Sequence, residues 1–279
     1  MNPLYIIIPV VSVILLLAVI AGVRLYLVAP ARRRGIVDKF KTVKFAHRGL
    51  HNGERAENSL SAFRAAADAG FGIELDVRLT RDGRLVVFHD STVDRMTGKS
   101  SRVIDLDYSA LAELPLGGTE DRVPLFSEVL SAVDGRVPLL IEIKQDLGEK
   151  SPVGALVEQL EGYHGEVLIE SFNPKALRDF KSYRPDLPRG ILSSQFSREK
   201  DKRGKILYFI LENMLSNFMA RPDFIAYEKD GYRSSSLRFV RRIFGTPLFA
   251  WTVKSAEEEE IALGRGFDSV IFEGYLPNK

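Results

Sequence analysis

Residues 71–77 read FGIELDV, a short apolar run that carries acidic residues at its fourth and sixth positions. A run of this length bounded by turn residues is typical of a buried strand, because a helix needs roughly ten or more residues. Seven other runs in the chain have the same character. The eight candidate strands are Val43–Ala46, Phe71–Val77, Pro138–Lys144, Glu166–Ser171, Arg189–Leu192, Asp223–Tyr227, Pro247–Val253 and Ser269–Phe272.

Helical patterns separate these strands. In Ser59–Ala69 the apolar residues Leu60 and Phe63 share one face, and we expect Asn58 to cap the helix and Gly70 to end it. Alternation of strand and helix eight times predicts an α/β fold, a TIM (β/α)₈ barrel. A chain of 279 residues is long enough for one such barrel.

Two further segments depart from the simple alternation. Arg84–Phe88 follows the turn Asp82-Gly83 and predicts a hairpin with the end of the second strand. Residues 91–123 have turn residues and no long periodicity, so we expect a loop insertion over one face of the barrel.

One apolar segment near the start, Leu4–Val23, has no charged residue. At about 1.5 Å per residue its length matches the roughly 30 Å hydrocarbon core of a bilayer, which predicts one N-terminal transmembrane helix. The alternative is a cleaved signal peptide, but residues 1–5 lack Lys and Arg and the run is long for such a peptide. We expect residues 1–35 to form the transmembrane helix and a basic juxtamembrane arm, and residues 36–279 to form the barrel domain.

Positive charge clusters on one side of this helix. Residues 1–44 hold seven of the 39 Lys/Arg and only one of the 37 Asp/Glu. The positive-inside rule then predicts a single-pass protein of the cell membrane, with its N-terminus outside, its barrel domain in the cytoplasm and its basic arm against anionic headgroups. The remaining residues have more acidic than basic side chains, which argues against a nucleic-acid partner. The absence of Cys excludes disulfides and a cysteine nucleophile.

Polar side chains gather where the first candidate strands end. They are His47, Arg48, Glu74, Asp76, His89, Glu142 and Lys144. In a barrel these strand ends form the C-terminal face, where active sites are built. Because residues two apart on a strand point to the same side, Glu74 and Asp76 can meet Glu142 at one mouth.

Three carboxylates in one place repel one another and raise one another's pKa unless a cation lies between them. The all-oxygen ligand set of Glu74, Asp76 and Glu142 favours one hard divalent cation, Mg²⁺ or Ca²⁺, over Zn²⁺. Arg48 and Lys144 would supply further positive charge for the oxygens of a phosphate.

Two of the four histidines, His47 and His89, stand at strand ends beside this expected metal site. An imidazole pair can remove a proton from an attacking oxygen and donate one to a leaving alkoxide, as cleavage of a phosphodiester requires. Each residue alone has a structural interpretation, and only their conjunction favours catalysis. We expect His51 and His164, which lie in turn sequences, at the surface.

Neighbouring polar residues are expected to support the site. Asp90 would orient the loop after His89, and Glu57 with Asn58 would brace Arg48.

These residues, in this order and spacing, resemble the glycerophosphodiester phosphodiesterase family from about residue 45 to the C-terminus. The matching motifs are His47-Arg48-Gly49, Glu57-Asn58-Ser59, Glu74-Leu75-Asp76-Val77, Thr80-Arg81-Asp82-Gly83, Val87-Phe88-His89-Asp90, Ile141-Glu142-Ile143-Lys144, Ser171-Phe172 and Ala250-Trp251-Thr252-Val253. The chain departs from the family's pattern at Ala56, where Pro is usual, and at Phe272-Glu273-Gly274-Tyr275, where Thr-Asp is usual.

The resemblance implies a TIM barrel of the PLC-like phosphodiesterase type that hydrolyses glycerophosphodiesters to sn-glycerol 3-phosphate and an alcohol. It also implies a divalent metal on the three carboxylates, His47 and His89 as the acid/base pair, and Arg48 and Lys144 near the phosphate. In the family the glycerol hydroxyl attacks phosphorus first, and water then opens the resulting cyclic phosphate.

Some alternatives stay open from the sequence. Trp251, at a strand end, is expected to line the substrate pocket, and an aromatic core plug is the other interpretation. Lys205–Met219 is unusually apolar, which is typical of a barrel helix packed on the sheet, while docking on the bilayer is the alternative. Two other functions also fit the chain: phospholipase D-like cleavage of lysophospholipids or sphingolipids, and a non-catalytic lipid-binding barrel.

Overall fold

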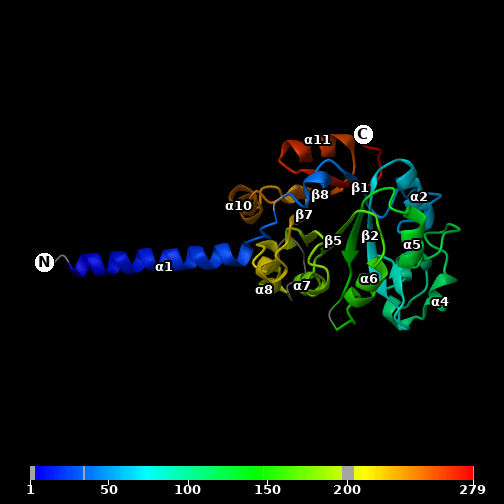
Figure 1. The fold of residues 1–279 in the computed structure, drawn as a ribbon, viewed down its shortest axis with the longest axis horizontal. Helices are drawn as coiled ribbons and strands as arrows, with labels where there is room; N and C mark the ends of the chain where they lie inside the picture. Colours follow the sequence, from blue (N-terminus) through cyan, green and yellow to red (C-terminus); the bar gives the residue numbers. More distant parts are fainter. Residues whose placement is uncertain (1–3, 34, 147, 197–203, 279) are drawn as a thin grey trace.

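The computed structural model describes residues 4–33, 35–146, 148–196 and 204–278, and its eight predicted strands form a closed parallel barrel (Figure 1). They are β1 Lys44–Ala46, β2 Gly72–Leu79, β4 Leu139–Ile143, β5 Val167–Ser171, β6 Arg189–Ser193, β7 Phe224–Glu228, β8 Leu248–Val253 and β9 Ser269–Phe272. Strand β9 pairs with β1, which closes the sheet. The short strand β3, Leu85–Val87, pairs antiparallel with β2. The predicted barrel and hairpin are confirmed.

Helices surround the barrel. They are α2 Leu60–Asp68, α5 Phe126–Val133, α6 Val153–Leu160, α7 Pro174–Tyr183, α8 Lys205–Glu212, α9 Asn217–Ala220, α10 Ser235–Phe244 and α11 Ala256–Gly264. The expected cap of α2 is wrong by one residue, because the side chain of Ser59, not that of Asn58, accepts from the Ala62 N–H. Asn58 takes a left-handed conformation (φ 56°) and instead donates from Nδ2 to Asp76 Oδ2 over 2.8 Å.

Apolar side chains fill the inside of the barrel beneath the polar mouth. This layer contains Phe45, Leu140, Leu168, Leu192, Phe224, Ala226, Phe249 and Ile271, and Val37 and Phe40 pack with it. Leu140 precedes Glu142 by two residues, and Phe249 precedes Trp251 in the same way. Since strand side chains alternate, the apolar layer supports the polar residues from below and restricts them to the C-terminal face.

Residues 91–123 are more regular than the expected loop. They contain α3 Asp94–Thr97, the 3₁₀ helix η2 Val103–Asp105 and α4 Tyr108–Ala112. Their apolar side chains contribute to a cluster separate from the barrel core, formed by Ala56, Val86, Phe88, Val93, Val103, Leu111, Leu114, Leu116 and Val123. The spacing of these residues follows no single period, so the sequence pattern indicated only a loop.

We expected the apolar segment Lys205–Met219 to form one helix packed on the sheet, and this expectation is wrong. It divides into α8 and α9 at Met214, which has a left-handed backbone (φ 57°) and is buried in the core. Helix α8 itself has no buried residue. The turn at Met214 therefore anchors the segment, while the apolar side chains of α8 stay outside the core.

Helix α1, Leu4–Val28, projects away from the barrel as a single rod (Figure 1). Within it Ile7–Val28 is long and apolar enough to cross a membrane, and no residue of its 18-residue apolar window is buried in the structure. The helix runs five residues beyond the predicted Leu4–Val23, because Arg24 ends the uncharged run without ending the backbone pattern.

The basic arm does not lie free beside the barrel. Arg33 donates from Nε to Asp223 Oδ1 over 2.9 Å and from Nη2 to the carbonyl of Leu187 over 3.0 Å. Lys39, Lys41 and Lys44 form ion pairs with Glu166, Asp38 and Glu259 respectively. These four residues therefore have acidic partners within the protein, and the placement of the basic arm against lipid headgroups stays a prediction.

Substitution of Asp223 tests this attachment. Asp223→Ala removes the fully buried carboxylate that accepts from Arg33 and from the Arg189 N–H, and it leaves the Arg189 guanidinium, itself 1% exposed, without its nearest charge partner. We expect a loss of about 3 kcal/mol in the free energy of unfolding, measured by denaturant titration of the detergent-solubilised chain. The control Asp186→Ala, which breaks the exposed pair with Arg184, should change it by less than about 1 kcal/mol. Equal effects would contradict the account.

Candidate active site

The structure brings the predicted site residues together at the C-terminal mouth of the barrel. One cavity of about 100 Å³ is lined by His47, Arg48, Glu74, His89, Glu142, Lys144, Glu170, Phe172, Leu192, Trp251, Thr252 and Ile271. Asp76 lies within the carboxylate cluster at its edge. A second cavity of about 340 Å³ shares His89, Glu142, Lys144 and Phe172 with the first, so the mouth continues as a longer depression.

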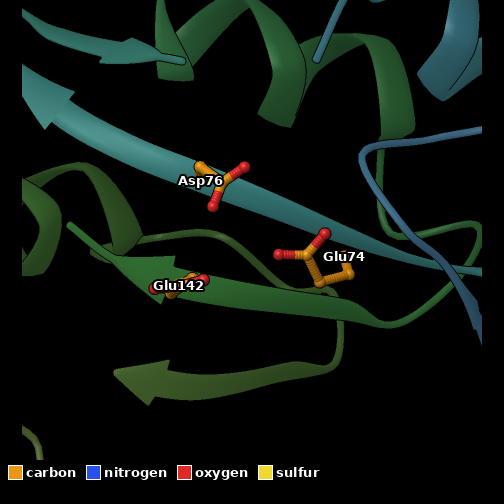
Figure 2. A group of neighbouring side chains, drawn as sticks. All are labelled: Glu74, Asp76 and Glu142. Atoms are coloured by element: carbon orange, nitrogen blue, oxygen red, sulfur yellow. The ribbon is translucent and has the colours of Figure 1, made fainter. Parts of the chain in front are cut away.

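Glu74 and Asp76 from β2 and Glu142 from β4 point toward one another (Figure 2). Asp76 pairs directly with Glu142 in the sheet register. One oxygen from each carboxylate lies within 4.8 Å of the others, and all three residues are buried. Such a group of converging oxygens has the composition and the size to hold a hard divalent cation.

Burial and mutual repulsion change the protonation of this cluster. Burial, followed by the charges of Asp76 and Glu142, holds the pKa of Glu74 well above its usual range. Burial also raises the pKa of Glu142 to about 7, although Lys144 opposes it. Burial acts in the same direction on Asp76, but the charges of Lys144, His89 and Arg48 outweigh it and lower its pKa. Without a cation, burial and mutual repulsion therefore favour the protonated forms of Glu74 and Glu142.

Two cationic side chains border the carboxylates. Lys144 Nζ lies 2.8 Å from Glu142 Oε1 and 3.3 Å from Asp76 Oδ1. The backbone N–H of Arg48 donates to Glu74 Oε2 over 2.9 Å, and its Nη1 donates to Glu57 Oε1 over 2.8 Å. Both cations are thereby fixed at the cavity wall, where the oxygens of a bound phosphate could reach them.

The two histidines have matching environments. His47 Nδ1 lies 2.6 Å from Glu273 Oε2, and His89 Nδ1 lies 2.6 Å from Asp90 Oδ1. Because an ionised carboxylate only accepts, Nδ1 carries the proton in each ring and Nε2 is the nitrogen left for proton exchange. Burial lowers the pKa of both rings, although the hydrogen bond to Glu273 opposes this at His47 and the charge of Asp76 opposes it at His89.

Comparison with known proteins identifies the family. A model described as the glycerophosphoryl diester phosphodiesterase family matches residues 47–274. The chain belongs to this family. A glycerophosphodiester phosphodiesterase of Caldanaerobacter subterraneus is 31% identical over 83% of this chain and 93% of its own length. The chain is accordingly a phosphoric diester hydrolase by class.

Solved structures share the fold. A phosphodiesterase of Oleispira antarctica in complex with sn-glycerol 3-phosphate has a TM-score of 0.70 at 22% identity and covers 85% of this chain and 94% of its own. The glycerophosphodiester phosphodiesterase of Thermotoga maritima has a TM-score of 0.62 at 27% identity, with 82% and 94% covered. A lysophospholipase D of Rattus norvegicus is 35% identical over a shorter stretch, 38% of this chain and 37% of its own length.

Asp90, Glu57 and Asn58 support the site, as predicted from the sequence. Asp90 contacts His89 and also accepts from Arg95 Nε over 2.6 Å, so it orients the loop after β3. Glu57 accepts from both Arg48 and Arg95. The backbone N–H of Asn58 donates to the carbonyl of Arg48 over 3.0 Å, so it braces Arg48 as expected, while its side chain donates to Asp76.

The remaining histidines lie outside the mouth. His164 is exposed, as expected. His51 is only partly exposed and lines a separate cavity of about 620 Å³ beside Glu273 and Tyr275, so its expected place at the surface holds only in part. This larger cavity contains neither the carboxylate cluster nor His89, and we do not assign the chemistry to it.

Trp251 lines the pocket rather than filling the core. It is half-buried on β8, and its ring meets that of Phe172 edge-to-face at 5.5 Å. Its buried Nε1 has no hydrogen-bond partner among the described residues, so this N–H donor is unsatisfied.

Sequence reasoning missed two acidic residues of the site. Glu170 pairs in register with Glu142, is 1% exposed, and has an Oε2 without a partner in the described part of the chain. Burial raises its pKa well above the usual range. Its position inside a buried strand, one strand along from Glu142, was the available signal. Glu273, noted only as a departure from the family pattern, is the partner of His47, and that hydrogen bond lowers its pKa to about 2.

The raised pKa of Glu142 predicts a pH effect on stability. Its folded value of about 7 exceeds the ordinary value of 4.5, so the folded chain holds a proton that the unfolded chain releases earlier. The folded chain is therefore more stable relative to the unfolded chain below pH 4.5, and this added stability is lost as the pH rises through 7. In EDTA at pH 8, Glu142→Gln should therefore raise the free energy of unfolding by about 1–3 kcal/mol.

Denaturant unfolding at pH 5 and pH 8 checks this expectation. The gain from Glu142→Gln should shrink at pH 5, and Glu260→Gln on the exposed face of α11 should give no gain at either pH. A Gln variant that is less stable than the parent at pH 8 in EDTA would contradict the repulsion described for this cluster.

Proposed function

We propose that this chain hydrolyses glycerophosphodiesters to sn-glycerol 3-phosphate and an alcohol. The observation that carries the proposal is the meeting of two histidines, two cations and three buried carboxylates at one barrel mouth in a member of this family. The product bound in the Oleispira antarctica structure supports the choice of substrate.

The carboxylate cluster fits one divalent cation, Mg²⁺ or Ca²⁺. Glu74, Asp76 and Glu142 would hold it, since their oxygens converge and repulsion among them is relieved when a cation binds. A bound ion of this kind would stabilise negative charge on the phosphate during reaction. Arg48 and Lys144 would bind the remaining phosphate oxygens, and Trp251 would contact the glycerol or the head group.

The histidines would move the protons. One ring, neutral and unprotonated at Nε2, would accept there the proton of the attacking glycerol hydroxyl. The other ring would enter the step as an imidazolium, protonated at both nitrogens, and would donate its Nε2 proton to the departing alkoxide as the bond from that oxygen to phosphorus breaks. Water would then open the cyclic phosphate with the two roles reversed. Glu273 and Asp90 would hold the rings of His47 and His89 in the required tautomer through Nδ1.

We also propose that residues 1–35 anchor the chain in the cell membrane as a single-pass segment, with the N-terminus outside and the barrel domain, residues 36–279, in the cytoplasm. The apolar span of α1 and the positive residues on its C-terminal side support this arrangement.

A second candidate activity is lysophospholipase D-like cleavage of lysophospholipids. An aromatic row favours it: the Trp251 ring contacts Phe172, Phe172 lies 6.0 Å from Phe196, and Phe196 stacks on Tyr208 of α8 at 5.8 Å. This row leads from the catalytic cavity to an apolar helix and could accommodate an acyl chain.

Loss of either histidine should abolish catalysis. With glycerophosphocholine and Mg²⁺ or Ca²⁺, His47→Ala and His89→Ala should each lower kcat by about 10²–10⁴-fold, because each removes one proton-transfer group. Release of glycerol 3-phosphate by the detergent-solubilised chain measures this, and His164→Ala should retain full activity. Cleavage of lysophosphatidylcholine but not glycerophosphocholine would favour the second candidate. No release from either substrate by a folded chain would contradict both.

Removal of the metal, or of one of the side chains that would bind it, should also lower the rate of catalysis. EDTA and Glu74→Gln should each reduce glycerol 3-phosphate release by at least about 10²-fold, and added Mg²⁺ or Ca²⁺ should restore only the EDTA-treated parent. Full activity of the parent after exhaustive chelation would overturn the assignment of these carboxylates to a metal.

A further inference from the structure

The end of α1 meets the barrel without an intervening linker. Asn217 Nδ2 donates to the carbonyl of Val28 over 3.1 Å, and Arg221 Nη1 donates to the carbonyls of Tyr26 and Ala29 over 2.9 and 3.0 Å. Val28 itself is 1% exposed and belongs to the barrel core. Since Ile7–Val28 is the candidate span, the barrel surface around Val28 must lie at the edge of the bilayer that α1 enters.

Apolar side chains surround this entry point. Ile206, Leu207 and Phe209 on α8 are 79%, 57% and 60% exposed. On α9, Phe218 is 39% exposed and its ring lies 6.0 Å from that of Tyr26, which stands inside the span. Phe218 therefore lies at the depth of the last turn of the membrane helix. We call the exposed side chains of these four residues the docking face.

Positive charge borders the docking face. Helix α10 lies beside α1, since the Arg24 guanidinium stacks over the Phe239 ring at 4.9 Å. Figure 1 shows α8 and α10 on either side of the inner end of α1. Arg238 and Arg242, one turn apart on α10, are exposed, as is Lys205 at the start of α8. An apolar centre with Arg and Lys around it is the composition of a surface that enters the headgroup region.

We propose that the docking face inserts into the same bilayer leaflet that α1 crosses, so that the barrel rests directly on an anionic phospholipid membrane instead of hanging from a tether. The inference rests on the proposed membrane insertion of α1 and is independent of the substrate. Two features select the bilayer as the occupant: the docking face continues the lipid-exposed surface of α1 without a gap, and its basic border matches anionic headgroups. The aromatic row from Tyr208 then connects the lipid boundary with the catalytic cavity.

The absence of Cys from the chain makes a direct test possible. Single variants Ile206→Cys and Phe209→Cys report from α8, Ile261→Cys reports from exposed α11 on another side of the barrel, and Val13→Cys reports from the middle of α1. Each is labelled with an environment-sensitive fluorophore in the full chain and reconstituted into phosphatidylcholine/phosphatidylglycerol vesicles. Lipids that carry a quencher in the acyl chain then measure contact with the bilayer.

We expect strong quenching at position 13 and quenching at 206 and 209 at least about twofold greater than at 261, because an interfacial helix lies roughly 5–10 Å into the boundary between headgroups and acyl chains. Quenching at 13 with none above the level of 261 at positions 206 and 209 would overturn the docking face alone. No quenching at 13 would overturn the insertion of α1 and the docking face with it, while leaving the hydrolysis unaffected. The fluorophores at 206 and 209 could instead report burial that depends on the density of protein in the vesicles and not on the quencher lipid. That result would assign the docking face to a second copy of the chain and contradict the proposal.

Discussion

The site depends on one constraint: three carboxylates from two neighbouring strands are buried close together. Register places Asp76 opposite Glu142, and the alternation along β2 adds Glu74 on the same side. Removal of these charges from water is unfavourable, and the structure offsets it with the positive charges of Lys144 and Arg48, while burial raises the pKa of Glu74 and Glu142. Repulsion among the three carboxylates is not fully relieved by these neighbours, and a bound cation would relieve it further.

The barrel makes this arrangement possible. Its inward layer of Phe and Leu side chains lies two residues before the polar positions. Packing in this layer stabilises the strands, while the C-terminal ends of the strands carry the charged residues. The neighbouring insertion has its own apolar cluster and supports the hairpin strand β3, which is followed by His89. Stability and chemistry are thus separated along the barrel axis, which is the usual division in this fold.

The sequence predicted the eight strands and the convergence of the acidic residues because both follow from periodicity and from the common direction of parallel strands. It did not single out Glu170, because the available signal, a Glu inside the predicted strand next to that of Glu142, does not by itself show that the side chain faces the other carboxylates. It placed the cap of α2 at Asn58 because capping rules do not register that a neighbouring carboxylate, Asp76, competes for the same amide. It also missed the break at Met214 and the pairing of Arg33 with Asp223, which depend on contacts between residues far apart in the chain.

The central claim is that Glu74, Asp76 and Glu142 form the binding site of one divalent cation. Calorimetric titration of the metal-free chain with Mg²⁺ or Ca²⁺ at pH 7, in buffers of different ionisation enthalpy, tests it by counting both ions bound and protons released. Since burial raises the pKa of Glu74 and Glu142 and a bound cation would lower it, we predict binding of one ion with release of about one proton, and loss of both signals in Glu74→Gln. Binding without proton release, or binding unchanged by the substitution, would contradict the account.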